Sequence, residues 1–184
     1  MQQLLVQRGF VVMQVDVRGS TGYGRAFREE FLTDFAGDDI EDLHSAVDYL
    51  ATQPWADTQR LGLWGSSYGG TLSVYSLLKK PGLFQVGVAA AAAVDPVFFG
   101  TDDVAIVRTP QTHPEVFERK ALKYVANLQD KLLFIHGMQD HVVPFKTTAM
   151  LAEELIKQGK NFDFAFPPGA THSWSREQNY DRYL

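Results

Sequence analysis

Residues 65–69 read Gly-Ser-Ser-Tyr-Gly and directly follow the short apolar run Leu61–Trp64. A G-x-S-x-G pentapeptide between a strand and a helix is typical of a sharp, strained turn that exposes a serine hydroxyl. The turn also directs the first amides of the next helix, predicted over 68–79, toward the place where an oxyanion would form. The pattern predicts that Ser67 is a nucleophile, and an ordinary Gly/Ser turn is the alternative.

A serine hydroxyl needs a base to take its proton and a third group to orient that base. Where the serine lies on such a turn, the chain order is Ser, then Asp or Glu, then His. His172 fits this order, because it lies in a loop just after the predicted strand 162–166 and can reach back over the sheet edge to Ser67. The remaining histidines fit less well, by position or by surroundings: His44, His113, His136 and His141.

The orienting carboxylate is expected where another strand ends. Asp140 follows the buried apolar strand 132–136 in a turn, on the side of the sheet where parallel α/β proteins keep their chemistry. Asp95 is the rival, since it also follows a strand-like apolar run. We favour Asp140, because it is one strand closer to the His172 loop. His141 is a poor base, since its side chain should point away from the adjacent Asp140.

The elements that must position these groups alternate along the chain. Short apolar runs without polar alternation are separated by helical patterns, which predicts one α/β domain with a mostly parallel sheet covered by helices on both faces. Asp38 is expected to cap the helix that carries Ile40 to Leu50, and 95–127 to be a long loop. The expected strands are 10–15, 61–64, 86–93, 132–136 and 162–166, and the other expected helices are 1–8, 68–79, 146–158 and one from about 177.

Composition excludes several classes of function. The 184-residue chain has 17 basic and 22 acidic residues, a net charge of −5, which argues against nucleic acid or an anionic membrane as partner. No run approaches the roughly 18 apolar residues of a membrane span, and the absence of cysteine excludes disulfides and thiolate chemistry. His136, Asp140 and His141 lack the geometry of a metal site, and Gly19–Gly24 lacks the pattern of a phosphate loop. We therefore predict no metal and no cofactor.

Several segments carry a resemblance to one known family, in the same order along the chain. They are Arg18–Gly24 with Phe27, Gly37–Asp42, Trp55–Asp57 with Arg60, Gly65–Gly70, His136–Asp140 with Val143 and Pro144, and Thr171 with His172. The first resembles the R-G-S-x-G-Y-G-x-x-F stretch of the prolyl oligopeptidase family of serine peptidases. The last three resemble its nucleophile, acid and base segments. The chain looks most like the dipeptidyl peptidase IV and acylaminoacyl peptidase branches.

The resemblance implies the three-layer α/β-hydrolase fold and the triad Ser67, Asp140 and His172. It implies that the backbone N–H of Tyr68 is one oxyanion donor. It also implies an apolar, proline-accepting substrate pocket, with plain core packing as the alternative for its two phenylalanines. The residues implied to line this pocket are Tyr68, Phe98, Phe99 and Val142.

Two positions depart from the usual pattern of the family. Val142 stands where these peptidases often carry a polar residue that holds the substrate's carbonyl, and Ser66 stands where the dipeptidyl branch often has Trp. In that family a β-propeller precedes the hydrolase domain. We therefore expect the chain to be a fragment of a larger protein, or a short gene product, without the propeller and the first strands.

Three functions are consistent with these observations. The first is a serine peptidase that hydrolyses peptide bonds through an acyl-enzyme. The second is a carboxylesterase on the same triad, with a small ester as substrate, since fold and triad do not separate amides from esters. The third is a catalytically silent domain that serves as a packing or dimer surface; a homo-oligomer is compatible with each of the three.

Overall fold

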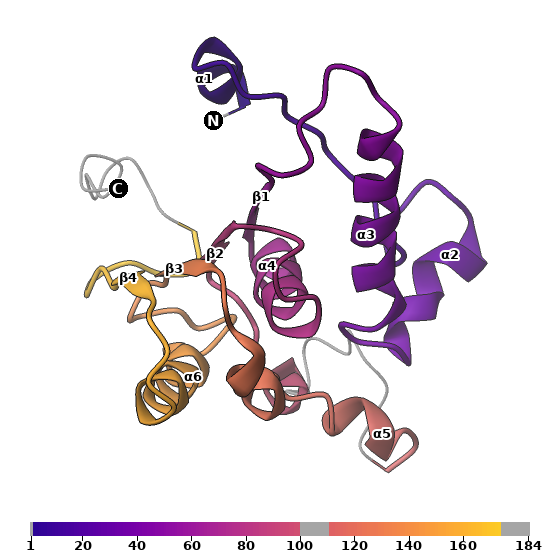
Figure 1. The fold of residues 1–184 in the computed structure, drawn as a ribbon. Helices are drawn as coiled ribbons and strands as arrows, with labels where there is room; N and C mark the ends of the chain where they lie inside the picture. The colour runs from indigo at the N-terminus through magenta and orange to yellow at the C-terminus, as the bar shows by residue number, and fades with distance from the viewer. Residues whose placement is uncertain (1, 100–110, 174–184) are drawn as a thin grey trace.

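The computed structural model describes residues 2–99 and 111–173, and a four-stranded sheet lies at its centre (Figure 1). All strands are parallel and adjacent in chain order. The strands are β1 (Gly62–Ser66), β2 (Val86–Ala90), β3 (Lys131–Ile135) and β4 (Asp163–Ala165). The register places Ser66, Ala90, Ile135 and Ala165 in one row. The carboxyl ends of all four strands therefore meet at one edge, and the chain is an α/β protein.

Among the described residues, three α-helices precede β1, the others lie between the strands, and α4 and α6 lie on the same side of the sheet. Figure 1 shows α4 and α6 on one side, α3 beyond α4, and α1 on the other side of the sheet. The α-helices are α1 (Gln2–Gln7), α2 (Arg25–Glu29), α3 (Asp38–Ala51), α4 (Tyr68–Lys79), α5 (Pro114–Phe117) and α6 (Phe145–Lys157). The 3-10 helices in the described part of the chain are η1 (Glu30–Leu32), η2 (Pro96–Phe99) and η3 (Ala121–Asn127).

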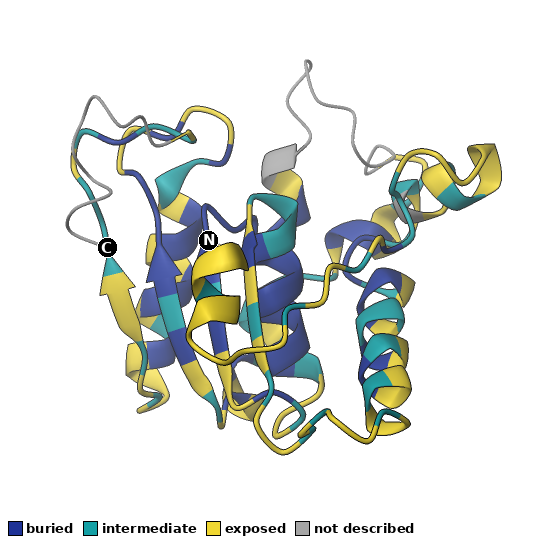
Figure 2. Ribbon diagram, turned by 90° about the horizontal axis from the view of Figure 1, so that it is seen from above, coloured by how far each residue is buried: buried dark blue, intermediate teal, exposed yellow. Residues whose placement is uncertain are grey.

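The core is centred on α4, which packs on β1 and β2 and is buried on almost all of its surface (Figure 2). After Tyr68 the helix continues with the small residues Gly69, Gly70 and Thr71. Its later turns carry Val74, Tyr75, Leu77 and Leu78, each 1% exposed or less. A Cβ added to Gly87 of β2 would lie 2.7 Å from Leu77 Cδ1. The glycine therefore lets the later turns of α4 approach the beginning of β2 closely.

The opposite face of the sheet is more exposed within the described residues. Trp64 of β1 is 56% exposed and Val86 of β2 is 40% exposed, and none of the residues of α1 is buried. We expected helices on both faces of the sheet. Within the described residues, α1 is the helix on this second face, and much of the apolar surface of the strands there is exposed to solvent.

The predicted strand over 10–15 is wrong. These residues form no strand, and Phe10, Val11 and Met13 are exposed. An extended segment becomes a strand only where a neighbour offers N–H and C=O partners. The described sheet ends at β1 on one side and at β4 on the other, and 10–15 pairs with neither.

Two further local expectations are also corrected. Asp38 does not cap α3: Gly37 holds the N-cap position, and the carboxylate of Asp34 accepts the hydrogen bond of the Asp38 N–H. The second strand ends at Ala90 rather than at 93, because Ala91 turns the chain with a φ of 46°. A residue in the left-handed region cannot continue a pleated strand.

The remaining elements agree with the sequence to within about two residues, apart from two segments. The expected long loop 95–127 contains η2, α5 and η3. The helix expected from about 177 lies outside the described residues.

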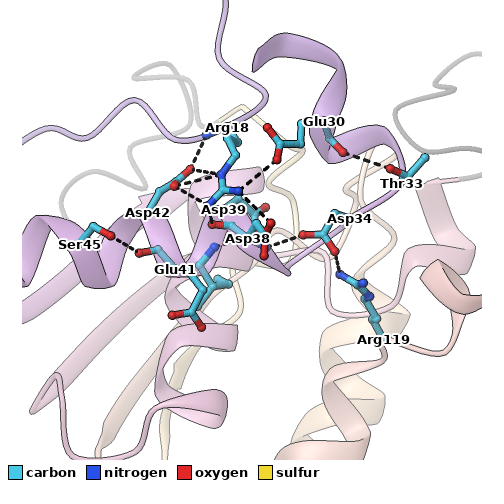
Figure 3. Close-up of polar contacts among 11 residues, drawn as sticks. Arg18, Glu30, Thr33, Asp34, Asp38, Asp39, Glu41, Asp42, Ser45 and Arg119 are labelled. Atoms are coloured by element: carbon cyan, nitrogen blue, oxygen red, sulfur yellow. Dashed lines mark hydrogen bonds and ion pairs between the residues drawn. The ribbon is translucent and has the colours of Figure 1, made fainter. Parts of the chain in front are cut away.

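Arg18 fastens the glycine-rich turn 18–24 to α3 (Figure 3). Its guanidinium forms ion pairs with Glu30, Asp38 and Asp42, at 3.1, 2.8 and 2.8 Å. The hydrogen bond to Asp42 is the largest of the effects that raise the pKa of Arg18. Since the glycines of this turn have φ values from 92° to 100°, the turn can bend in a way that most side chains would prevent.

Candidate active site

Ser67 occupies a strained turn between β1 and α4. Its φ and ψ are 55° and −119°, a conformation that a residue with a side chain rarely adopts. A Cβ on Gly65 would lie 2.3 Å from the carbonyl carbon of Gly69, and a Cβ on Gly70 would lie 2.5 Å from the carbonyl oxygen of Ala90. Glycine at 65 and at 70 is therefore a steric requirement of the turn.

Hydrogen bonds hold this turn against the end of β2. The Ser67 N–H donates to the carbonyl oxygen of Ala90 at 2.9 Å, and the Thr71 N–H donates to that of Ser67 at 3.0 Å. The Thr71 hydroxyl donates to the Ala93 carbonyl and accepts from the Ala93 N–H, both at 2.9 Å. The hydrogen bonds of Ser67 and Thr71 to the segment 90–93 thus fix the position of the serine relative to the sheet.

The loop after β3, which carries Asp140 (the acid loop), touches the loop after β4, which carries His172 (the base loop). The Gln139 N–H donates to the Ala170 carbonyl at 3.0 Å, and the Met138 N–H donates to the Pro167 carbonyl at 3.1 Å. A Cβ on Gly137 would lie 2.3 Å from the Ala170 carbonyl oxygen. Glycine at 137 therefore allows the two loops to approach closely enough for their side chains to meet.

The structure brings Ser67, Asp140 and His172 together, although they lie far apart in the sequence. His172 Nδ1 lies 2.7 Å from Asp140 Oδ2, and His172 Nε2 lies 3.0 Å from Ser67 Oγ. Because a carboxylate can only accept, Nδ1 carries a proton and Nε2 presents its lone pair to the serine hydroxyl. The side chain of His172 is 20% exposed and that of Asp140 is fully buried.

Asp140 is held by more than one group. Its Oδ1 accepts the N–H groups of Val142 and Val143, at 2.9 and 2.8 Å. His136 Nε2 lies 3.2 Å from Asp140 Oδ2 and 3.0 Å from the Val143 carbonyl oxygen. Both neighbours of Nε2 are acceptors, so this nitrogen carries the proton and Nδ1 accepts from the Thr148 hydroxyl, at 2.8 Å. Burial is the main cause that lowers the pKa of His136, so the ring is a neutral donor to the carboxylate.

The alternative acid, Asp95, and the neighbouring His141 have other surroundings than the three residues of the site. Asp95 accepts the Val97 N–H at 3.0 Å and lies 3.5 Å from the Lys120 ammonium. His141 is exposed to solvent. Within residues 2–99 and 111–173, no group of three or more histidine, aspartate and glutamate side chains is placed to bind a metal ion.

The residues expected around the substrate pocket are only partly described. Val142 is 56% exposed, close to the acid loop. Phe98 and Phe99 belong to η2, and the structure describes their backbone but not their side chains. Tyr68 begins α4, and its hydroxyl donates to the carboxylate of Asp39 on α3. This contact was not foreseen from the sequence, because Asp39 reads there as one of several acids in a helix's first turn.

Comparison with known proteins agrees with this architecture. A family model described as "Prolyl oligopeptidase family" matches residues 1–184. The chain belongs to the prolyl oligopeptidase family. It is 32% identical over 184 residues to the uncharacterized peptidase YuxL of Bacillus subtilis and 30% identical over 189 residues to dipeptidyl peptidase 8 of Mus musculus. These matches cover 95% and 97% of this chain.

Solved structures of the prolyl oligopeptidase family superimpose well on the chain. Dipeptidyl peptidase 4 of Porphyromonas gingivalis gives a TM-score of 0.81 at 28% identity, over 91% of this chain and 25% of that one. An acylaminoacyl peptidase in complex with Z-Gly-Gly-Phe-chloromethyl ketone gives 0.78 at 26% identity, over 91% and 29%. The chain spans only 28% of the length of the Bacillus relative and 21% of the mouse relative. No helix among the described residues is long and apolar enough to cross a bilayer.

Proposed function

We propose that the chain carries the catalytic site of a serine peptidase. The arrangement of Ser67, His172 and Asp140 is the observation that carries this proposal, because the base lies within hydrogen-bond reach of both partners. Family membership supports the same chemistry. Since the relatives are several times longer than this chain, we propose that the site works within a longer protein, with a β-propeller as its partner.

The geometry supports a two-step hydrolysis. His172 Nε2 takes the proton of Ser67 as Oγ bonds to the peptide carbonyl carbon, and Asp140 stabilises the resulting imidazolium. His172 then returns that proton to the leaving amine as the C–N bond breaks. A water molecule attacks the acyl-enzyme by the same route, and it releases the acid and restores the serine.

The first turn of α4 supplies the electrostatic part of the proposal. Tyr68 is the first residue of α4, and its N–H directly follows the nucleophile at the end of the helix where the backbone dipoles favour negative charge. We propose this N–H as an oxyanion donor. For the substrate we propose an apolar, proline-accepting pocket that involves Tyr68, Phe98, Phe99 and Val142.

A fluorophosphonate probe, followed by turnover assays, tests the proposal. Wild type should be labelled, Ser67→Ala should not, and His172→Ala should lose more than about 10³-fold in kcat because the base is absent. The control is His141→Ala, which removes an exposed histidine one residue from Asp140 and should retain activity within about twofold. Equal losses in His141→Ala and His172→Ala would overturn the assignment of the base.

The choice of substrate separates the alternatives. Faster turnover of a Pro-p-nitroanilide supports a peptidase, whereas turnover of a p-nitrophenyl ester alone supports a carboxylesterase on the same triad. A folded wild-type chain that neither labels nor turns over either substrate would contradict an active site within these 184 residues.

A further inference from the structure

The side chain of the residue after the nucleophile is anchored in a different element. Tyr68 begins α4, but its hydroxyl donates to Asp39 Oδ2 in the first turn of α3. The same hydroxyl oxygen lies 3.4 Å from the N–H of Ala36. The position of α3 and the position of the first residue of α4 are therefore linked through a single side chain.

The buried carboxylate of Asp39 accepts hydrogen bonds from one side chain, that of Tyr68, and from one backbone N–H. Asp39 is 1% exposed, and its other oxygen accepts the Ile40 N–H at 2.8 Å. A buried carboxylate without hydrogen bonds is costly, so the contact with Tyr68 strongly favours one orientation of both side chains. The charged groups that face this carboxylate are Asp34, on the turn before α3, and Lys79 of α4.

The ionisation states of Asp39 and Tyr68 are consistent with a hydrogen bond donated by the tyrosine hydroxyl to the carboxylate. Burial is the main cause that raises the pKa of Asp39 to about 6, and burial also raises the pKa of Tyr68 well above its ordinary value. At pH 8 the aspartate is therefore an acceptor and the tyrosine is a neutral donor.

The ring of Tyr68 is also confined. It meets the edge of Phe35 at 5.8 Å between ring centroids, and Phe35 meets Tyr75 at 5.7 Å. Phe35 is fully buried. The ammonium of Lys79 donates to the Ala36 carbonyl, so the turn that carries Phe35 and Ala36 is tied to both ends of α4. Tyr68 is thus held by the helix that contains its backbone, by Phe35 against its ring and by Asp39 at its hydroxyl.

We propose that Asp39 is a positioning residue, which fixes Tyr68 through its hydroxyl so that the Tyr68 N–H points at the developing oxyanion. This proposal rests on the proposed function. The direction of that N–H depends on the backbone at Ser67, which is held in a strained conformation. A side chain fixed at its far end resists the rotation that would relieve the strain.

The test compares Asp39→Asn, Tyr68→Phe and the double variant of the 184-residue chain at pH 8. We expect kcat to fall by roughly 10-fold to 100-fold, with KM unchanged, because the N–H acts on the transition state. The affinity for phenylboronic acid, which forms a tetrahedral adduct with the serine, should fall by the same factor. The double variant should lose no more than either single variant, because the two groups act as one unit.

Asp38→Asn is the matched control, since Asp38 is an exposed acid in the same turn of α3 that pairs with Arg18 instead. It removes the same charge from the start of the helix and should keep kcat within about twofold. Tyr68→Phe keeps the ring and removes only the hydroxyl. Wild-type kcat in Tyr68→Phe would overturn the proposal, even if Asp39→Asn failed to fold.

Hydrogen exchange at the Ser67 and Thr71 amides gives a readout that needs no turnover. Faster exchange at both amides in Asp39→Asn and Tyr68→Phe, but not in Asp38→Asn, supports the anchor. Unchanged exchange overturns it. If wild type proves inactive, the proposed function fails for this chain, and the exchange measurement still decides whether Asp39 holds the turn.

Discussion

Gly65 and Gly69 flank the serine in the same pentapeptide but have different surroundings. A Cβ at Gly65 would strike the backbone of Gly69 at 2.3 Å, whereas a Cβ at Gly69 would meet nothing within 4 Å. The spacing of the motif alone treats the two glycines as equivalent. The structure shows that only the first is required by a backbone-to-backbone approach.

We therefore expect Gly65→Ala, but not Gly69→Ala, to lower the free energy of unfolding. Gly65→Ala should lower it by about 1–3 kcal/mol, because backbone atoms must move. Gly69→Ala should leave it unchanged or raise it by up to about 1 kcal/mol, because alanine favours a helix. Urea unfolding of both variants measures the difference, and equal losses would contradict this account.

At the scale of elements, Arg18 and Arg25 offer a comparison of partly buried and exposed ion pairs. The side chain of Arg18 is 23% exposed and joins three carboxylates, from η1 and α3, to the glycine-rich turn. Arg25 is 83% exposed and pairs with Glu29 within one helix. Exposed pairs within a helix contribute little to stability, whereas a shared, partly buried guanidinium satisfies several acceptors at once.

Arg18→Met should consequently lower the free energy of unfolding by about 1–3 kcal/mol, since three carboxylates lose their common partner. Arg25→Met should lower it far less, because its ion pair with Glu29 is exposed to solvent and screened. Chemical unfolding at low and at high salt measures the difference between the two variants. Indistinguishable losses would mean that Arg18 does not fasten the turn to α3.

Elements with strong local patterns were predictable, and elements that depend on distant partners were not. The helix at 68–79 has the observed bounds of α4, because a strained turn begins it and Pro81 follows it. The segment 10–15 has the composition of a strand, yet pairing decides whether a strand forms. Gly37 is the N-cap residue of α3, and the carboxylate that accepts the Asp38 N–H is that of Asp34, which the local pattern does not distinguish from its acidic neighbours.

The same division applies to the candidate site. The pentapeptide, the chain order and the positions of the loops after the strands together selected Ser67, Asp140 and His172. The structure brings these three side chains together, while their catalytic roles remain proposals. The contacts of Asp39 with Tyr68, and of His136 with Asp140, depend on how α3, α4 and the acid loop pack. A buried histidine at the end of a strand could have suggested a link to Asp140, whereas nothing near Asp39 in the sequence distinguishes it from Asp38.

For the whole molecule, the exposed face of the sheet predicts self-association of this chain. Trp64 is 56% exposed on β1, beside the exposed Val86 of β2. Contiguous apolar surface on a sheet favours contact with another apolar surface. Trp55 is 57% exposed but lies in the turn after α3, so it serves as a control of the same residue type.

Trp64→Gln should reduce the concentration-dependent mass that light scattering reports, together with the binding of an apolar dye. Trp55→Gln should leave both close to wild type. Equal effects of the two substitutions would show that association does not use this face of the sheet.

The four strands end in a single row, formed by Ser66, Ala90, Ile135 and Ala165. This row separates the positions where the sequence can accept insertions from those where it cannot. Ser67, Asp140 and His172 all follow that row, whereas the connections before β1, β2, β3 and β4 lie at the far end of the strands. Insertions there would lengthen the chain without moving a reacting group. One end of the molecule is thereby constrained by chemistry, and the other is open to variation, fusion and circular permutation.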